Sequence, residues 1–149
     1  MLADLGADVI KVENPDRPDE ARSYGRRETP DSEPSMEGVF QQYNRGKRGV
    51  ALNIQSDQGR SLLKRLLAEA DVFVTNVRLQ SLQKLGLDYD SLKDEFPSLV
   101  YGQLSAWGLQ GEMVKDPGYD FGGKRSSSLN FALLLPKRPQ QLPRSLLGI

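Results

Sequence analysis

Short apolar segments that alternate with an amphipathic, helix-forming segment are the feature of this sequence that most restricts its fold. Four of these segments have the length and the Val, Ile, Leu and Phe content of buried strands. They are residues 8–13, 48–54, 70–76 and 99–105. Residues 56–70 carry leucines at helical spacing after Ser56, a favourable N-cap. This order predicts an α/β fold, in which helices flank a Rossmann-like parallel sheet with right-handed crossovers.

Local signals place the remaining elements. The segment before residue 8 is typical of the last turns of a helix closed by Gly6, and a doubly wound domain has another strand before such a helix. We therefore expect that strand upstream of Met1. Residues 79–85 predict a short helix that ends at Gly86.

Three further expectations complete the arrangement. Residues 14–38 are rich in Pro and charged residues and predict a loop. A second short helix, capped by Asp88 or Asp90, runs to Phe96. The apolar stripe of the helix at 56–70 is expected to face the core. It consists of Leu62, Leu63, Leu66, Leu67 and Ala70.

The composition excludes several kinds of chemistry. The 149 residues include no cysteine and no histidine, so disulfides, thiolate nucleophiles, Ser-His-Asp triads and histidine-ligated zinc sites are excluded. Twenty basic residues balance twenty acidic ones, and no apolar run reaches the ~18 residues of a membrane span. We therefore expect neither nucleic acid nor a membrane as partner, and no metal. Carboxylates, lysines and tyrosines remain as candidate reactive groups.

The most informative candidate is Asp120, which follows the last predicted strand in a glycine-rich stretch, residues 105–120. Glycines in such a loop allow a substrate to approach the backbone closely, and catalytic groups concentrate on loops of this kind. Asp120 is therefore a candidate nucleophile. The alternative is an ordinary turn that contains an aspartate.

Glu13 raises a second possibility, because an acid at the end of an early strand resembles the carboxylate that holds an adenosine ribose in dinucleotide-binding folds. The Gly-x-Gly-x-x-Gly turn that such a site needs is absent from this sequence. A solvent-facing or helix-capping Glu13 is the preferred interpretation.

Taken in order, five motifs resemble the class III CoA-transferases, the CaiB-BaiF and formyl-CoA transferase family. The resemblance covers roughly residues 2 to 122, as part of the family's large Rossmann-like domain. The motifs are Leu-Ala-Asp-Leu-Gly-Ala-Asp-Val-Ile-Lys-Val-Glu at 2–13, Asn-Arg-Gly-Lys-Arg-Gly-Val-Ala-Leu-Asn-Ile at 44–54, Ala-Asp-Val-Phe-Val-Thr-Asn at 70–76, Leu-Gly-Leu-Asp-Tyr at 85–89 and Gly-Tyr-Asp at 118–120.

The resemblance implies transfer of CoA from an acyl-CoA to a free carboxylic acid. An aspartate carboxylate, here matched by Asp120, forms a mixed anhydride and then an aspartyl-CoA thioester. Acyl-CoA is thus a substrate, and no permanently bound cofactor is expected. The family also implies an interlocked homodimer. It leaves the acceptor acid open, as well as the choice between a cytoplasmic and a mitochondrial location.

By position, the resemblance also implies contacts with CoA. The matching residues are Leu52, Gln55, Asn76, Val77, Arg78, Lys84 and Lys115. Basic side chains suit the phosphates of CoA, although ordinary solvated charge is the alternative for the lysines and arginines. Some family members have an arginine where this chain has Asn14, which puts one phosphate contact in doubt.

Two departures from the family's sequence pattern bear on the predicted function. Related acyl-CoA racemases commonly carry histidine where this chain has Tyr119, so transfer is favoured over racemisation. Residues 123–149 match none of the family's expected continuation and include five basic residues but no acidic one. We expect residues 1–122 to form a partial domain truncated at both ends, and residues 123–149 to form an atypical, disordered tail. The isolated chain is then expected to be inactive, or to be a non-catalytic CoA-binding or interaction remnant.

Overall fold

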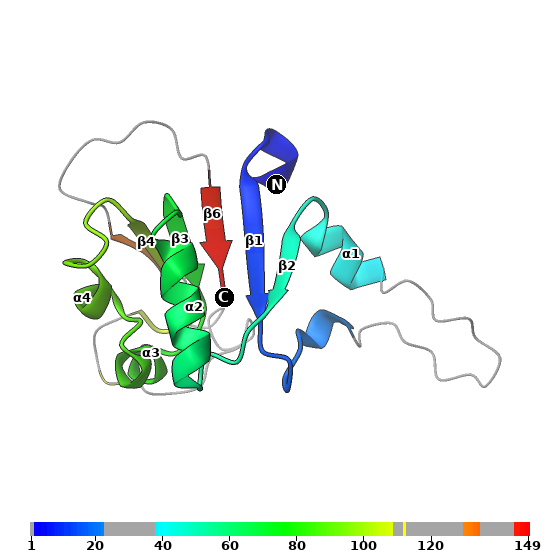
Figure 1. Cartoon of the computed structure of the whole chain (residues 1–149). Coiled ribbons are helices and arrows are strands. Elements are labelled where there is room, and N and C mark those ends of the chain that lie inside the picture. The colour runs from blue at the N-terminus through cyan, green and yellow to red at the C-terminus, as the bar shows by residue number, and fades with distance from the viewer. Residues whose placement is uncertain (1, 23–37, 109–111, 113–129, 135–144) are drawn as a thin grey trace.

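The computed structural model describes residues 2–22, 38–108, 112, 130–134 and 145–149 (Figure 1). The described strands are β1 (Asp8–Glu13), β2 (Arg48–Ala51), β3 (Val72–Thr75), β4 (Val100–Ser105), β5 (Asn130–Leu134) and β6 (Ser145–Gly148). The α-helices are α1 (Gly38–Asn44), α2 (Asp57–Leu67), α3 (Leu79–Leu85) and α4 (Tyr89–Leu92). Two 3₁₀ turns, η1 (Ala3–Leu5) and η2 (Glu20–Arg22), flank β1.

All six strands belong to one sheet, in the order β2-β1-β6-β3-β4-β5. Neighbouring strands from β2 to β4 in this order are parallel, and β5 pairs antiparallel with β4. Figure 1 shows α2 in front of the sheet, with α3 and α4 beside it. The predicted α/β fold with a parallel sheet and flanking helices is therefore confirmed.

The position of β6 differs from the expectation for residues 123–149. Two segments of this supposedly disordered tail, β5 and β6, are strands of the sheet. β6 lies between β1 and β3, at the middle of the parallel part. The physical reason is pairing on both edges, because Ile10 of β1 and Val72 of β3 have partners in β6 at Leu147 and Leu146. The domain boundary at residue 122 remains a prediction.

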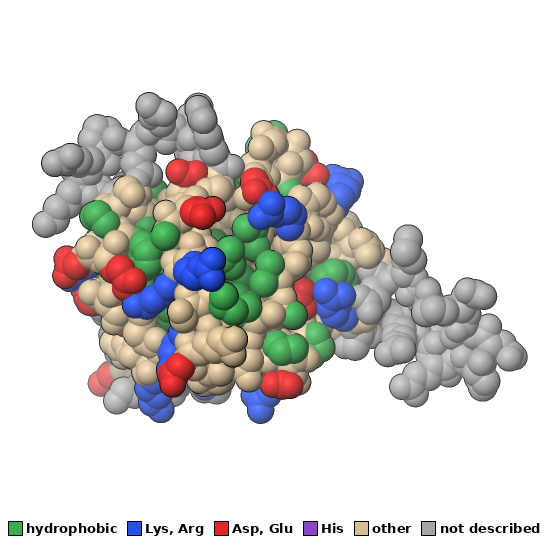
Figure 2. All heavy atoms as spheres, in the orientation of Figure 1, with side chains coloured by type: hydrophobic (Ala, Val, Ile, Leu, Met, Phe, Trp, Pro, Cys, Tyr) green, Lys and Arg blue, Asp and Glu red, His purple; other side chains and the backbone are tan. Residues whose placement is uncertain are grey.

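The core forms between the sheet and α2. Leu63 and Leu67 of α2 are almost fully buried in one cluster with Phe73 of β3 and Tyr101 of β4. The two aromatic rings meet edge to face at a centroid distance of 5.2 Å, an arrangement that favours aromatic pairs. Leu62, which we expected in the core stripe, is instead 37% exposed, because it lies at the margin of the buried face of α2. Figure 2 shows that further hydrophobic side chains are exposed near the middle of this face of the molecule.

Glycines and a serine set several element ends as predicted. Gly6 and Gly86 follow η1 and α3 with φ angles of 94° and 64°, in the left-handed region that favours glycine. The Ser56 hydroxyl caps α2 by accepting a hydrogen bond from the Gly59 N–H at 3.0 Å. β2 ends at Ala51, earlier than predicted, because the chain turns at Asn53, whose side chain accepts from the Gln55 N–H at 2.9 Å.

Candidate functional site

The parallel strands β1, β2, β3, β4 and β6 end at the same edge of the sheet. Paired residues at this edge are Glu13 with Ala51 and Thr75 with Gln103. Open α/β sheets bind ligands outside the carboxyl ends of their strands, near the point where the strand order reverses. In this sheet the order reverses between β1 and β3, on either side of β6. We therefore take this carboxyl edge as the candidate site.

The turn from β2 to α2 carries two of the residues expected to contact CoA. The Leu52 N–H donates to the Glu13 carbonyl at 2.9 Å, so Leu52 extends the β1–β2 pairing to the edge. Gln55 is exposed, and its carbonyl accepts a hydrogen bond from Arg60 at 2.8 Å. The turn is therefore held by its own hydrogen bonds, with the Gln55 side chain facing solvent.

The turn from β3 to α3 carries three more. The Val77 N–H donates to the Thr75 hydroxyl at 3.1 Å, and the Val77 carbonyl accepts from the Gln103 side chain at 3.3 Å. The Asn76 N–H donates to the Ile149 carbonyl at 3.3 Å. Asn76 and Arg78 are exposed, so both side chains are accessible from solvent at the edge.

Lys84 and Arg78 lie at opposite ends of α3. Arg78 is the N-cap of this helix, and Lys84 is an exposed residue of its last turn. Lys84 comes six positions after Arg78, which corresponds to roughly 9 Å along the helix axis. Lys84 is therefore set apart from Arg78, at the far end of the helix.

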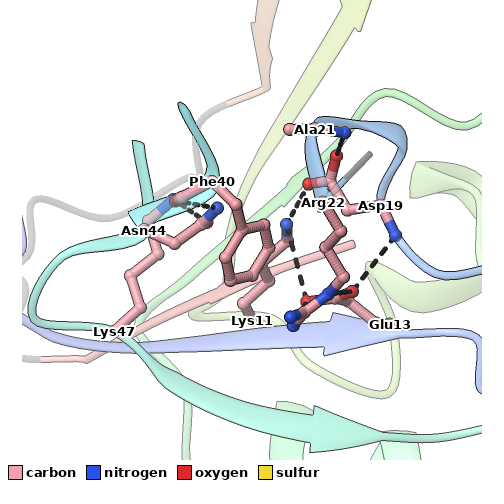
Figure 3. Close-up of polar contacts among 8 residues, drawn as sticks. All are labelled: Lys11, Glu13, Asp19, Ala21, Arg22, Phe40, Asn44 and Lys47. Carbon is pink, nitrogen blue, oxygen red and sulfur yellow. Dashed lines mark hydrogen bonds and ion pairs between the residues drawn. The ribbon is translucent and has the colours of Figure 1, made fainter. Parts of the chain in front are cut away.

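A group of charged residues around one aromatic ring lies at the end of β1 (Figure 3). We call it the Phe40 cluster; its members are Lys11, Glu13, Asp19, Arg22 and Phe40. Glu13 accepts two hydrogen bonds from the Arg22 guanidinium, at 3.1 and 3.0 Å, and a third from the Asp19 N–H at 3.2 Å. Lys11 forms an ion pair with Asp19 and lies 3.6 Å from Glu13.

Both cations of the cluster lie against the ring of Phe40, which belongs to α1. The Arg22 guanidinium carbon is 3.6 Å from the ring centroid, and the Lys11 ammonium is 4.7 Å from it. Both distances suit cation–π attraction. The ring is 8% exposed, so α1 fastens the segment after β1 to the sheet through this contact. Sequence reasoning missed both α1 and the ring, because the contacts join segments far apart in the chain.

The cluster changes the ionisation of its members. Hydrogen bonds from Arg22 lower the pKa of Glu13, and the bond from Lys11 lowers the pKa of Asp19. Burial, followed by the charge of Lys11, lowers the pKa of Lys47, whose ammonium donates to the Asn44 side chain at 2.9 Å. We had expected Glu13 to face solvent or to cap a helix. Instead, it does not face solvent, and it does more than cap a helix. Its side chain is 15% exposed, because two cations neutralise its charge inside the cluster.

The remaining expected residues, Asp120 and Lys115, lie outside the described residues. The segment that leads toward them begins after β4. At the end of this strand, the Ser105 hydroxyl is buried and has no hydrogen-bond partner within the described part of the chain. Within the same ranges there is no group of three acidic residues able to hold a metal ion. None of the helices described is long and apolar enough to cross a membrane.

Comparisons with known proteins agree with the motifs and the fold. The family model for CoA-transferase family III matches residues 1–148. The chain is 40% identical over 121 residues to the (R)-2-hydroxy-4-methylpentanoate CoA-transferase of Clostridioides difficile, a match that covers 81% of this chain and 30% of that protein. It is 40% identical over 123 residues to the succinate–glutarate CoA-transferase of Agrobacterium fabrum, covering 81% and 31%.

Solved structures give the same result. A CaiB/BaiF family protein from Brucella suis superposes with a TM-score of 0.70 at 42% identity, over 80% of this chain and 32% of that one. The chain thus spans about a third of the length of the relatives it matches. Family model, sequence identity and structure agree, and the chain belongs to CoA-transferase family III.

Proposed function

We propose that this chain forms the CoA-binding part of an enzyme that moves CoA from an acyl-CoA to a free carboxylic acid. The observation that carries the proposal is that the β2–α2 and β3–α3 turns both lie at the carboxyl edge of the sheet in a family III fold. The relatives named above are CoA-transferases that act on different acids, so the acid itself stays open.

Charge at the edge supports binding of CoA. The exposed side chains of Arg78 and Lys84 provide two positive charges on α3, and Asn76 adds an amide beside them. Phosphates form charge-assisted hydrogen bonds with such groups. In this proposal the phosphates lie along α3, and Leu52, Gln55 and Val77 contact the rest of the nucleotide. Lys115 is a further basic contact proposed from its position in the sequence alone.

The proposed chemistry is covalent catalysis by a carboxylate. The carboxylate attacks the thioester carbonyl and the C–S bond breaks. CoA leaves as a thiolate, and an acyl-aspartyl anhydride remains. The thiolate then attacks the aspartyl carbonyl, which releases the first acid and leaves an aspartyl-CoA thioester. The acceptor carboxylate repeats the two steps in reverse order and departs as its CoA thioester. Asp120 is the candidate for this carboxylate, on its motif alone.

The short length of the chain bears on whether it is active alone. Because the chain covers about a third of its relatives, we propose that it binds CoA but does not complete the transfer alone. A non-catalytic CoA-binding or interaction remnant is the alternative function. Interlocked dimerisation, which the family resemblance implies, would belong to a longer chain. A racemase-like activity is disfavoured, since the chain has no histidine.

Binding of CoA tests the first part of the proposal. Titration calorimetry with CoA is expected to give saturable binding that weakens about tenfold on Arg78→Ala or Lys84→Ala, the loss of roughly one charge-assisted contact. Lys93→Ala is the matched control, because Lys93 is an exposed lysine of the neighbouring α4 segment paired with Asp90. Absence of CoA binding, or equal weakening in the control, would refute a CoA site at this edge.

Labelling tests the nucleophile. The protein for this assay is this chain joined to the remaining sequence of a full-length family member. It is incubated with a radiolabelled acyl-CoA and then digested. We expect the label on Asp120, and we expect it to be lost in Asp120→Asn. The same assay on the chain alone, with succinyl-CoA and a panel of acids, is expected to show no turnover. Label on any other residue would remove Asp120 from the mechanism, and robust turnover by the chain alone would contradict the proposed inactivity.

A further inference from the structure

The central position of the sheet is held by a strand of four residues. β6 pairs with β1 on one side and with β3 on the other, and all of these pairings are parallel. In the strand order of the described sheet, β2 and β1 are connected to β3 and β4 only through β6. The two halves of the sheet therefore form an acceptor with two free edges whenever β6 is out of place.

The acceptor recognises the start of β6 through Asp71, the residue before β3. The Asp71 carboxylate accepts hydrogen bonds from the Ser145 N–H at 2.7 Å and from the Ser145 hydroxyl at 2.9 Å. The hydroxyl also contacts the Glu69 carbonyl, at 3.1 Å, and accepts from the Asp71 N–H at 3.0 Å. These contacts fix which residue of the strand lies opposite Asp71, and a one-residue slip would break them all.

The rest of the strand is recognised by shape and by the backbone. Leu147 is 1% exposed and belongs to the core cluster with Val12 of β1 and Phe73 of β3. Its side chain is therefore buried among residues from both halves of the sheet. The Ile149 N–H donates to the Val74 carbonyl at 2.9 Å, and the Ile149 carbonyl accepts from the Asn76 N–H. A serine, a leucine two residues later and an extended backbone are thus the features that the acceptor selects.

We propose that the space between β1 and β3 is a strand-acceptor site, specific for an extended segment of the form Ser-x-Leu, and that β6 is its replaceable occupant. Addition of a peptide strand to open sheet edges is an established mode of recognition, in which backbone hydrogen bonds provide affinity and side-chain pockets provide selectivity. The ligand class is an apolar peptide strand that carries these two residues. The inference is independent of CoA binding.

The test uses the full chain and a fluorescent peptide with the sequence of residues 143–149, Pro-Arg-Ser-Leu-Leu-Gly-Ile. In the wild-type chain β6 competes for the site, so binding measured by anisotropy is expected to be weak. Leu147→Ser weakens the chain's own strand, and this variant is expected to bind the peptide at least about tenfold more tightly. Asp71→Asn added to that variant, or alanine at the peptide position equivalent to Ser145, is expected to reduce binding about tenfold.

A crosslinked chain provides the control that does not depend on a destabilised variant. The chain has no cysteine, and Val9 and Leu146 are direct partners in β1 and β6. Val9→Cys with Leu146→Cys is expected to form a disulfide within one chain, whereas Val9→Cys with Leu147→Cys is not, because neighbouring strand residues face opposite sides. Oxidation should abolish peptide binding in the first pair, and reduction should restore it. Failure of the first pair to crosslink, or peptide binding that oxidation leaves unchanged, would overturn the proposal.

Discussion

Replacing Glu13 by glutamine removes one of the two negative charges of the Phe40 cluster while keeping the size of the side chain. Glu13 accepts two hydrogen bonds from Arg22 and one from the Asp19 N–H, and its side chain is only 15% exposed. Hydrogen bonds to charged groups contribute roughly 1.5–3 kcal/mol each when intact. Glutamine keeps one acceptor oxygen, and Arg22 is 40% exposed, so water compensates in part. We expect Glu13→Gln to reduce the free energy of unfolding by about 2 kcal/mol at pH 7.

The effect should depend on pH with a defined sign. The pKa of Glu13 is lowered from 4.5 in the folded chain, so its ionised form stabilises the fold above that value. The contribution is lost as the pH falls through the lowered pKa. The difference between wild type and Glu13→Gln should therefore be complete at pH 7 and should shrink steadily below pH 4.5. Asp19, whose pKa is also lowered, adds an acid-sensitive contribution that both proteins share.

Urea unfolding followed by fluorescence of Trp107, the single tryptophan, measures this difference at each pH. The control is Asp90→Asn, which removes a carboxylate that pairs with Lys93 at 2.6 Å but is 78% exposed. Such surface pairs contribute about 0–1 kcal/mol, so the control should change stability little. The reasoning is refuted if Glu13→Gln is as mild as the control at pH 7, or if its effect is unchanged at pH 3.

Two further substitutions test the packing, each against a matched control in thermal or urea unfolding. Gly59→Ala should destabilise the fold by about 1–3 kcal/mol, although alanine has the better helix propensity, because a Cβ there would lie 2.0 Å from the Asn53 carbonyl oxygen. The control is Gly49→Ala, which should be neutral or slightly stabilising, because a Cβ at that position would meet open space. Leu63→Ala should cost about 2–5 kcal/mol, since this side chain is fully buried, and Leu62→Ala, 37% exposed, should cost less than about 1 kcal/mol; equal losses within either pair would contradict the packing.

Elements with strong local signals were predictable from the sequence. The strand predicted at residues 8–13 and the helix predicted at 79–85 coincide with β1 and α3. Each is bounded by a glycine in the left-handed conformation, Gly6 before the strand and Gly86 after the helix. The start of α2 followed from Ser56, whose hydroxyl makes the expected capping bond. Helix α4 stops at Leu92, short of the predicted end at Phe96.

Features that depend on distant residues were not predictable. β6 has only four residues, and its neighbours are selected by pairing with β1 and β3 and by the contact of Ser145 with Asp71. The Phe40 contact likewise needs Arg22 and Lys11 from separate segments. Sequence reasoning placed Asn76 at the carboxyl end of a strand, and the family resemblance added Leu52, which lay inside a predicted strand but follows β2 in the structure. Their contact with CoA, and the role of Asp120, stay predictions.

The location of β6 has a consequence for the order of events during biosynthesis. A ribosome must translate past Gly148 before β6 can pair with Ile10, although Ile10 and its other partner, Arg48 of β2, emerge much earlier. Until then, the nascent polypeptide exposes two incomplete ribbons with unsatisfied main-chain groups. Long-range parallel pairing of this kind is slow and leaves intermediates open to aggregation. Assembly of this sheet is thus a late step, and yields of the protein in cells should depend on chaperones that shield the waiting edges.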